Sequence, residues 1–328
     1  LCNNRFKFRD LCPHLEPEPI LRHFTPTGMH YRRWENLRIF ARMPPRSFTV
    51  CPPSKSLLKR RCFSMAMHPL LTIAIRAART AGNTIIRSSD QLERLTVEQK
   101  TLNDFVSEVD RLAEKDIIEI IHKAYPNHAI LSEEAGSIPA KDKEGEDFLW
   151  IIDPLDGTTN FLHGMPHYAV SIACKVKGRL EIAVVYNPVT DELFTASRGN
   201  GAKLNNTRIR VSSRKDLDGA LLGTGIPFSQ DRDFDAYLST MRKFMGRPAG
   251  IRRAGAAALD LAYVAAGRFD GFWEEQLKPW DMAAGVLLVQ EAGGLIADLD
   301  GNNQYMESGD VVCGTPRVYK EMLPLVKK

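Results

Sequence analysis

The chain has little cysteine beyond its first 66 residues and no long hydrophobic run, and each absence narrows the class of protein. Only two of the six cysteines, Cys174 and Cys313, lie beyond residue 66, which is too few for a disulfide framework in 328 residues. No stretch of 18 apolar residues occurs, so no membrane span is expected. An apolar content of 44% is ordinary for a protein with a full core. We therefore expect a cytoplasmic protein with no membrane partner.

Residues 1–66 lack the patterning that the rest of the chain shows. They contain 8 of the 19 prolines, and they hold 13 Lys and Arg against 4 Asp and Glu, whereas the remaining residues hold 31 against 36. They have no apolar core after a basic start, which argues against a secretory signal, and too little Ser for an organelle-targeting helix. We interpret 1–66 as a non-native or disordered extension, with the true start at Met65 or Met67, and expect it to be dispensable.

From Met67 onward the apolar residues follow regular periods. Helical spacing covers about 70–85 and 107–125, and a short apolar strand at 129–131 delivers Glu133 and Glu134 to its end. Strands separated by short turns then predict an antiparallel sheet, at 168–175, 179–186, 192–197, 202–204 and 207–211. Alternating strands and helices follow, with strands at 221–223, 271–273, 295–297 and 311–313 and helices at 234–244, 256–266, 281–292 and 316–325.

This change of pattern near residues 212–216 predicts two lobes in an α/β protein. Residues 67–213 would form an α+β lobe with the antiparallel sheet and the main chemical motif. Residues 214–328 would form an α/β lobe that completes the active site.

The most informative stretch is the motif Asp153-Pro154-Leu155-Asp156-Gly157-Thr158-Thr159-Asn160-Phe161, which follows an apolar run ending at Ile152. We expect a buried strand that delivers two carboxylates to its end, with Pro154 stiffening a turn between them and a helix starting after Gly157. Carboxylate oxygens suit Mg²⁺, and the amides at a helix start suit a phosphate. Metal and phosphate together indicate phosphate-ester chemistry.

Three other interpretations compete with this one. A turn with solvated Asp residues remains open on the residues alone. An aspartyl-phosphate phosphatase is rejected, because Pro154 stands where D-x-D-G-T needs its nucleophilic Asp. A dinucleotide-binding turn needs G-x-G-x-x-G. The nearest glycine pair, Gly199-Asn200-Gly201, has Leu204 at the third glycine position and lies between strands, so it indicates a hairpin turn.

The motif at 153–161 resembles the signature of the inositol monophosphatase family. The resemblance extends from about Met67 to the C-terminus, and His68-Pro69, 169–173 and 259–268 are similar to bacterial SuhB-like members of the family. It implies a layered α-β-α-β-α sandwich and a homodimer. It also implies Mg²⁺-dependent hydrolysis of myo-inositol 1-phosphate by an activated water, with sensitivity to Li⁺.

Five carboxylates stand at strand ends or helix starts: Asp110, Glu133, Asp153, Asp156 and Asp281. Each alone is more often a helix cap or a solvated side chain, but together they favour a site for more than one cation. The resemblance assigns Glu133, Asp153 and the carbonyl of Leu155 to a first Mg²⁺. It assigns Asp153, Asp156 and Asp281 to a second, and Asp110 to a looser third. Glu134 is ambiguous by chemistry, and the motif position selects Glu133.

The resemblance also implies roles in catalysis and substrate binding. Thr158, with Glu133 and Asp110, would orient and deprotonate the attacking water. Glu274, seven residues before Asp281, would accept hydrogen bonds from ring hydroxyls. The implied substrate-binding residues are Asp156, Gly157, Thr158, Gly255, Ala256, Ala257, Glu274 and Asp281. Ala256 departs from the hydroxyl residue often found at its position, and the small residues at 254–258 also suit close helix packing.

Two further functions remain open. Relatives that act on nucleotide 3′-phosphates, fructose bisphosphate or histidinol phosphate share the metal motif. SuhB-like proteins are also partners of the machinery that transcribes ribosomal RNA, which implies RNA polymerase or an antitermination complex as a partner. Arg252, Arg253, Arg268 and Lys278 would serve such binding, although exposed cations are usually only solvated. Because this chain keeps all five carboxylates, we favour an enzyme acting on a sugar or inositol phosphate.

Overall fold

A computed structural model of the chain describes residues 67–89, 92, 97–101, 104–227 and 233–327. The segment 1–66, interpreted above as an extension, lies outside the described residues. The part from Met67 onward belongs to one compact unit. The division into lobes at 67–213 and 214–328 stays a prediction.

The larger sheet has eight strands in the order β10-β9-β8-β7-β6-β5-β3-β4. The interior strand β5 (Phe148–Asp156) is parallel to β3 (Ala129–Ser132) and antiparallel to β6 (Ala169–Val176). The other strands are β4 (Gly136–Ile138), β7 (Arg179–Asn187), β8 (Glu192–Ser197), β9 (Ala202–Leu204) and β10 (Thr207–Arg208). The predicted antiparallel run from β6 to β10 is confirmed.

The last strand of this run is shorter than predicted. β10 ends at Arg208 rather than at Val211, because the chain leaves the sheet there. The Ile209 amide still donates to the Ala202 carbonyl at 3.0 Å, but the Val211 amide donates to the Ala292 carbonyl at 3.2 Å, at the end of a helix.

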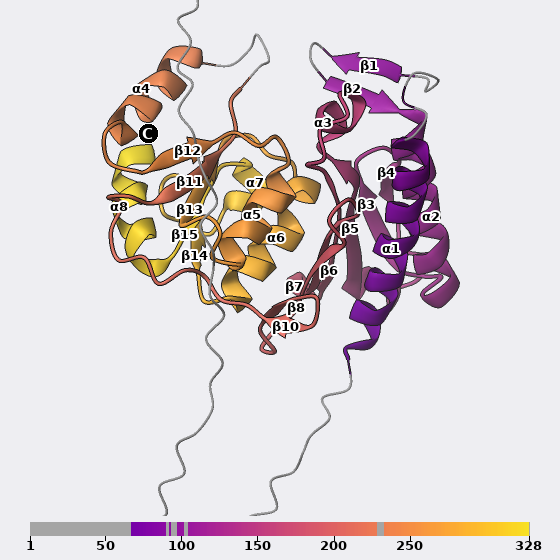
Figure 1. Cartoon of the computed structure of the whole chain (residues 1–328). Coiled ribbons are helices and arrows are strands. Elements are labelled where there is room, and N and C mark those ends of the chain that lie inside the picture. The colour runs from indigo at the N-terminus through magenta and orange to yellow at the C-terminus, as the bar shows by residue number, and fades with distance from the viewer. Residues whose placement is uncertain (1–66, 90–91, 93–96, 102–103, 228–232, 328) are drawn as a thin grey trace, which may run out of the picture. The chain divides into compact units, whose positions relative to one another are not determined.

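One face of the larger sheet is covered by α1 (Pro69–Ser89) and α2 (Glu108–Ala124) (Figure 1). Their inward residues, such as Ala74, Ile85 and Ile117, share one buried cluster with Trp150 and Ile172 of the sheet. Both helices were predicted, including Pro69 in the first turn, where its missing N–H is tolerated. The hairpin of β1 (Val97–Thr101) and β2 (Asp104–Ser107), which lies between them in sequence, was not.

Two helices cover the opposite face: α5 (Ala257–Ala265) and α6 (Pro279–Glu291). Both are buried on nearly all sides, as expected for helices that lie between two sheets. Small residues let them approach closely, and any side chain at Gly285 of α6 would overlap Leu261 of α5.

The second sheet has five strands in the order β12-β11-β13-β15-β14. They are β11 (Leu221–Thr224), β12 (Gly250–Arg252), β13 (Gly271–Glu274), β14 (Leu295–Ala297) and β15 (Val311–Gly314). β11 is parallel to β12 and β13, whereas β15 is antiparallel to β13 and β14. Phe244 of α4 (Phe234–Phe244) and Met322 of α8 (Pro316–Val326) pack on its outer face.

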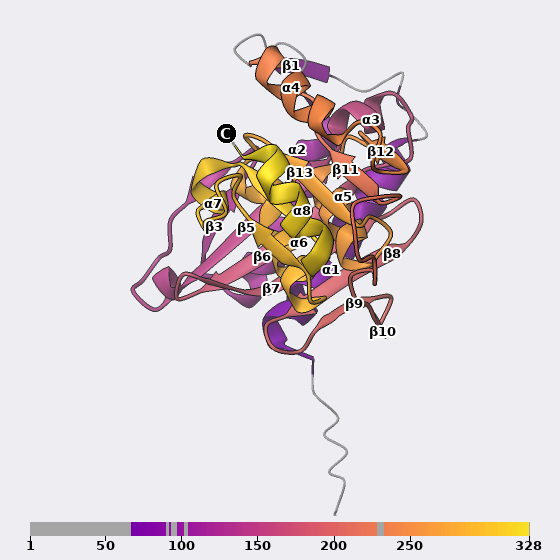
Figure 2. The same cartoon turned by 90° about the vertical axis from the view of Figure 1, so that its left-hand side faces the viewer.

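These elements form five layers, α1 and α2, the larger sheet, α5 and α6, the smaller sheet, then α4 and α8 (Figures 1 and 2). The predicted α-β-α-β-α sandwich is confirmed. Short helices α3 (Thr158–Leu162) and α7 (Tyr305–Ser308) lie in connections. No helix of the described residues has the length and apolarity needed to cross a membrane. Cys174 and Cys313 are both buried free thiols.

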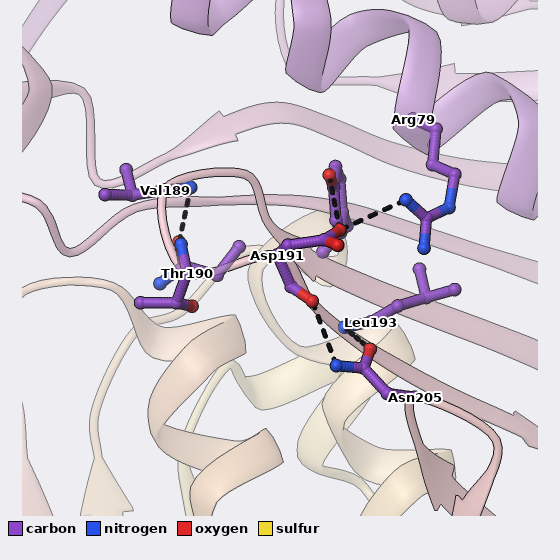
Figure 3. A network of polar contacts seen from close by, with 8 residues as sticks. Arg79, Val189, Thr190, Asp191, Leu193 and Asn205 are labelled. Carbon is purple, nitrogen blue, oxygen red and sulfur yellow. Dashed lines mark hydrogen bonds and ion pairs between the residues drawn. The ribbon is translucent and has the colours of Figure 1, made fainter.

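A polar network around Asp191 holds the β7–β8 turn against α1 (Figure 3). One carboxylate oxygen of Asp191 accepts hydrogen bonds from Arg79 at 3.1 Å and from the Tyr186 hydroxyl at 3.0 Å. Its carbonyl accepts from the Asn205 side chain at 3.0 Å, and Asn205 in turn accepts from the Leu193 amide at 2.9 Å. The β7–β8 turn of the larger sheet is thereby bound to α1.

His128 lies between two aromatic rings just before β3. Its imidazole stacks on Tyr125, with 4.7 Å between centroids, and on Phe148, with 4.1 Å. Its Nδ1 accepts a hydrogen bond from Trp150 Nε1 at 3.1 Å. Because an indole N–H only donates, this bond requires an unprotonated Nδ1. Burial lowers the pKa of His128, and His122 lowers it further, while Asp142 opposes the shift.

We predict that the stability of the fold decreases below about pH 6.5, the usual pKa of an unfolded histidine. The folded state favours neutral His128, so its contribution is fully present above that pH and is lost as the pH falls through the lower folded pKa. Urea unfolding at several pH values would measure this loss. His128→Phe keeps the stacking but cannot titrate, so its pH dependence should be shallower; equal pH dependence in both proteins would contradict the prediction.

Candidate active site

The motif at 153–161 begins inside β5, at an irregularity in the strand. Asp153 pairs with Ser171 of β6 and Asp156 pairs with Ala169, so β5 has one residue more than its partner over this interval. The sequence predicted a turn around Pro154, but the strand continues to Asp156 with a bulge. Proline cannot donate to the ladder, which makes a bulge the place where a strand accommodates it.

Asp153 and Asp156 are both buried, with 2% and 9% of their surface exposed. Burial raises the pKa of Asp153 well above its usual range, and the charges of Glu133, Asp156 and Asp281 raise it further. Burial and the charge of Asp281 do the same for Asp156. The structure therefore brings four of the five predicted carboxylates close enough to act on one another's ionisation.

Two of these carboxylates also cap helices, which is the common role of a single carboxylate at a helix start. Asp156 Oδ2 accepts a hydrogen bond from the Ala258 amide at 2.7 Å, in the first turn of α5, whose N-cap Ala256 has no polar side chain. Asp281 Oδ2 accepts from the Lys278 amide at 2.7 Å at the start of α6. Capping uses one oxygen of each group, so it is compatible with a further ligand role.

Thr158 connects the motif to α2. Its hydroxyl lies 2.9 Å from Asp110 Oδ1 and 3.0 Å from the Leu155 carbonyl, and Asp110 is fully buried in the first turn of α2. The preceding Gly157 has φ of 93°, and a side chain there would meet the His167 carbonyl at 3.0 Å. Only glycine fits this position without strain.

Glu133 follows β3, and its amide donates to the Ile152 carbonyl at 3.2 Å, next to Asp153. The neighbouring Glu134 amide donates to Glu114 Oε1 at 3.0 Å. Glu114 is a residue of this region that the sequence analysis left out. Its signal in the sequence is its spacing, four residues after Asp110 on the same helix.

A pocket of about 200 Å³ lies beside the carboxylates. It is lined by Asp156, Thr224, Gly225, Arg253, Gly255, Ala256, Ala257, Glu274, Leu277 and Asp281. Six of these are predicted site residues, whereas Thr224, Gly225, Arg253 and Leu277 were not predicted to face it. Glu274 lies against Gly225, where any side chain would overlap its carboxylate. A larger hollow of about 330 Å³ lies at the start of α1, away from the carboxylates. We therefore choose the candidate site by the chemistry of its lining residues and not by its volume.

The donor atoms of this region suit a hard divalent cation. They are carboxylate and carbonyl oxygens, the ligands that Mg²⁺ prefers, and buried like charges need a counter-ion to be stable. Among the residues that the structure describes, no group of three or more Asp, Glu, His or Cys side chains is arranged so that it could hold a metal ion. The residues therefore fit Mg²⁺ in kind, and the assignment of individual ligands is a proposal.

Asn160 joins the motif to the loop before α5. Its Nδ2 donates to the His167 carbonyl at 2.7 Å and to the Ala254 carbonyl at 2.9 Å, with the Gly255 carbonyl at 3.3 Å. The side chain is 8% exposed. One amide group thus holds the pocket-lining residues around Gly255 against α3.

Comparisons with known proteins find relatives in both sequence and fold. The model of the inositol monophosphatase family matches residues 66–327. The chain is 58% identical over 263 residues to Nus factor SuhB of Pseudomonas aeruginosa, covering 80% of this chain and 97% of that protein. It is 53% identical over 257 residues to Nus factor SuhB of Escherichia coli K12, covering 78% and 95%.

Solved structures share the fold. The extragenic suppressor protein suhB from Bartonella henselae is 44% identical and has a TM-score of 0.76, covering 80% of this chain and 99% of that one. An inositol monophosphatase from Anabaena is 34% identical with a TM-score of 0.67, covering 78% and 94%. These likenesses confirm the predicted layered fold.

We predict that Asn160→Asp destabilises the protein more than Asn160→Ala. The alanine variant leaves buried carbonyls without their donor, at about 1–3 kcal/mol. The aspartate variant also directs a negative charge at the same carbonyls. Urea unfolding of the two variants and the wild type would measure the difference. A neutral effect of Asn160→Asp would show that these three hydrogen bonds do not hold the loop.

Proposed function

The chain belongs to the inositol monophosphatase family, and from that premise we propose that it is a Mg²⁺-dependent phosphatase that hydrolyses myo-inositol 1-phosphate. The observation that carries this proposal is the group of carboxylates around the buried Asp153 and Asp156: the charges of Glu133, Asp156 and Asp281 raise the pKa of Asp153, and the charge of Asp281 raises the pKa of Asp156. This group lies beside a pocket that also holds Glu274. Family membership supports phosphatase chemistry, and the substrate and the metal are our proposal.

The metal ligands follow the family pattern. Glu133, Asp153 and the Leu155 carbonyl would hold a first Mg²⁺, and Asp153, Asp156 and Asp281 a second. Asp110 would contribute to a looser third site. When bound, Mg²⁺ supplies positive charge that polarises the phosphate and makes a nearby water more acidic.

The protein's own groups then act on that water and on the phosphate. Thr158 donates its proton towards Asp110, which leaves its oxygen lone pairs to accept a hydrogen bond from the water. Glu133 accepts the water's proton. The water oxygen would bond to phosphorus as the bond to the inositol oxygen breaks, and that oxygen would take up a proton from solvent water to leave as a hydroxyl. The amides of Gly157 and Thr158 would hold the phosphate. The scheme uses no nucleophilic side chain, so it has no covalent intermediate.

Substrate selection would depend on pocket residues that are not assigned to the metals. Glu274 ends β13, and we propose that it accepts hydrogen bonds from the inositol hydroxyls. The backbone of Gly255, Ala256 and Ala257 would face the ring. Nucleotide 3′-phosphates, fructose bisphosphate and histidinol phosphate are the alternative substrates, and a phosphate-release screen over these compounds would rank them.

A second proposed role is that of a Nus factor, with RNA polymerase or an antitermination complex as partner. It is supported by two relatives of that name that are more than half identical to this chain. Arg252 and Lys278 are exposed and would serve such a surface, whereas the exposed Arg253 also lines the pocket beside the carboxylates. Arg268 is also exposed, but it is bound to Glu192 and lies 4.8 Å from the Tyr263 ring centre, so it is committed to the fold. We further propose a cytoplasmic homodimer.

We predict that Asp153→Asn abolishes phosphate release while the protein remains folded. Asp153 is assigned to both principal metals, so the substitution removes the shared negative charge. Without Mg²⁺ the melting temperature should be kept, because one of several crowded like charges is removed. Phosphate release and thermal melting without Mg²⁺ are the measurements. A near-normal rate would refute the metal assignment.

We predict that Glu274→Gln reduces kcat/KM for inositol 1-phosphate by roughly tenfold to a hundredfold. A charged acceptor lost from a hydroxyl contact is worth about 1.5–3 kcal/mol. Glycerol 2-phosphate has no ring, so its hydrolysis should change little, and Mg²⁺ dependence should be unaffected. An equal decrease on both substrates would place Glu274 with the metals or the fold. No decrease on either would remove the main support for inositol as substrate.

A further inference from the structure

Helix α2 presents two buried carboxylates to the active-site region. Asp110 and Glu114 are 0% and 5% exposed, and because they are four residues apart they lie on one face of the helix. Asp110 accepts the hydrogen bond from Thr158 of the motif. Glu114 serves a different segment, the turn between β3 and β4 that carries Glu133.

Glu114 binds the residues on both sides of Glu133. Its Oε1 accepts hydrogen bonds from the Ser132 hydroxyl and, at 3.0 Å, from the Glu134 amide. Glu133 itself donates its amide to the Ile152 carbonyl at 3.2 Å. Three consecutive residues are therefore fixed, two by α2 and one by β5, and the backbone that aims the Glu133 side chain has little freedom.

We propose that Glu114 is a positioning residue that holds Glu133 in place for metal binding and for accepting the proton of the water. The inference rests on the function proposed above and deepens it. Since Asp110 and Glu114 are separated by about 6 Å along a rigid helix, α2 sets the placement of Thr158 and of Glu133 relative to each other. Supporting groups of this kind commonly change metal affinity or activity by about 10- to 100-fold.

A merely structural role is the alternative, because any buried carboxylate that satisfies two donors stabilises a fold. The chain offers a matched control on the same helix. Asp116 Oδ2 accepts a hydrogen bond from the Thr84 hydroxyl at 2.6 Å and so joins α2 to α1. Among the described residues it has no hydrogen bond to the motif or to the Glu133 turn. Removing Asp116 should lower stability without affecting Glu133.

The experiment compares the full-length wild type with Glu114→Ala, Glu114→Gln and Asp116→Ala. Hydrogen exchange of the Glu134 amide without metal reports whether the turn is held. The Mg²⁺ concentration that gives half of the maximal thermal stabilisation reports how well the site binds metal. Neither readout requires turnover.

We expect Glu114→Ala to exchange faster at Glu134 and to need about 10- to 100-fold more Mg²⁺. Glu114→Gln should stay within about threefold of the wild type, because both hydrogen bonds go to one oxygen that an amide also provides. Asp116→Ala should melt earlier but match the wild type in both readouts. If Glu114→Ala does not fold, Ser132→Ala removes one of the two bonds and should shift the Mg²⁺ midpoint by about threefold.

The outcomes separate the inference from the proposed function. If the wild type shows no response to Mg²⁺, the metal-dependent function fails and the inference falls with it. If the wild type responds and Glu114→Ala responds at the same concentration, only the inference is overturned. It is also overturned if Glu114→Gln is as impaired as Glu114→Ala, because charge rather than the held geometry would then be the cause.

Discussion

The arrangement of this protein depends on one constraint, the burial of several carboxylates beside one another at the end of β5. Asp153 and Asp156 are nearly inaccessible, and Glu133 and Asp281 act on them through their charge. Such a group is tolerated only when backbone amides and cations compensate it. The amides of Leu155 and Ala258 supply part of that compensation, and they come from the motif itself and from α5. The packing of the layers places both amides beside the carboxylates that accept their hydrogen bonds.

Glycines and small residues give the carboxylates the space they need. Gly157 takes a conformation that other residues avoid, Gly225 leaves room for Glu274, and Gly285 lets α6 approach α5. These positions lie far apart in sequence but share one effect, since at each of them a side chain would press on a neighbouring residue. The shape of the site therefore depends on the lack of side chains at these glycines as well as on the acidic groups.

The sequence predicted the elements that have a local signal. α4 and β8 were placed at their observed bounds, because helical periodicity and turn residues mark their ends. β12, with the sequence Gly-Ile-Arg, was missed because it contains a single apolar residue and so shows no apolar run. The bulge at Pro154 depends on the register of β6, so it is not visible in the local sequence. The spacing of Glu114 from Asp110 is visible there, but its hydrogen bond to the Glu134 amide is not. Glu133, Asp156 and Asp281 are close enough to Asp153 to raise its pKa, and the roles of the individual carboxylates remain predictions.

The hydrogen bond from Ala258 to Asp156 has a consequence for how the molecule assembles. Asp156 ends β5 of the larger sheet, whereas Ala258 lies in the first turn of a helix between the sheets. The pocket is lined by Asp156 and by residues at the start of α5, so it forms only when the larger sheet and α5 have packed together. A chain in which only one sheet has formed would thus lack the pocket that holds Glu274, and substrate selectivity would appear only in the fully folded protein.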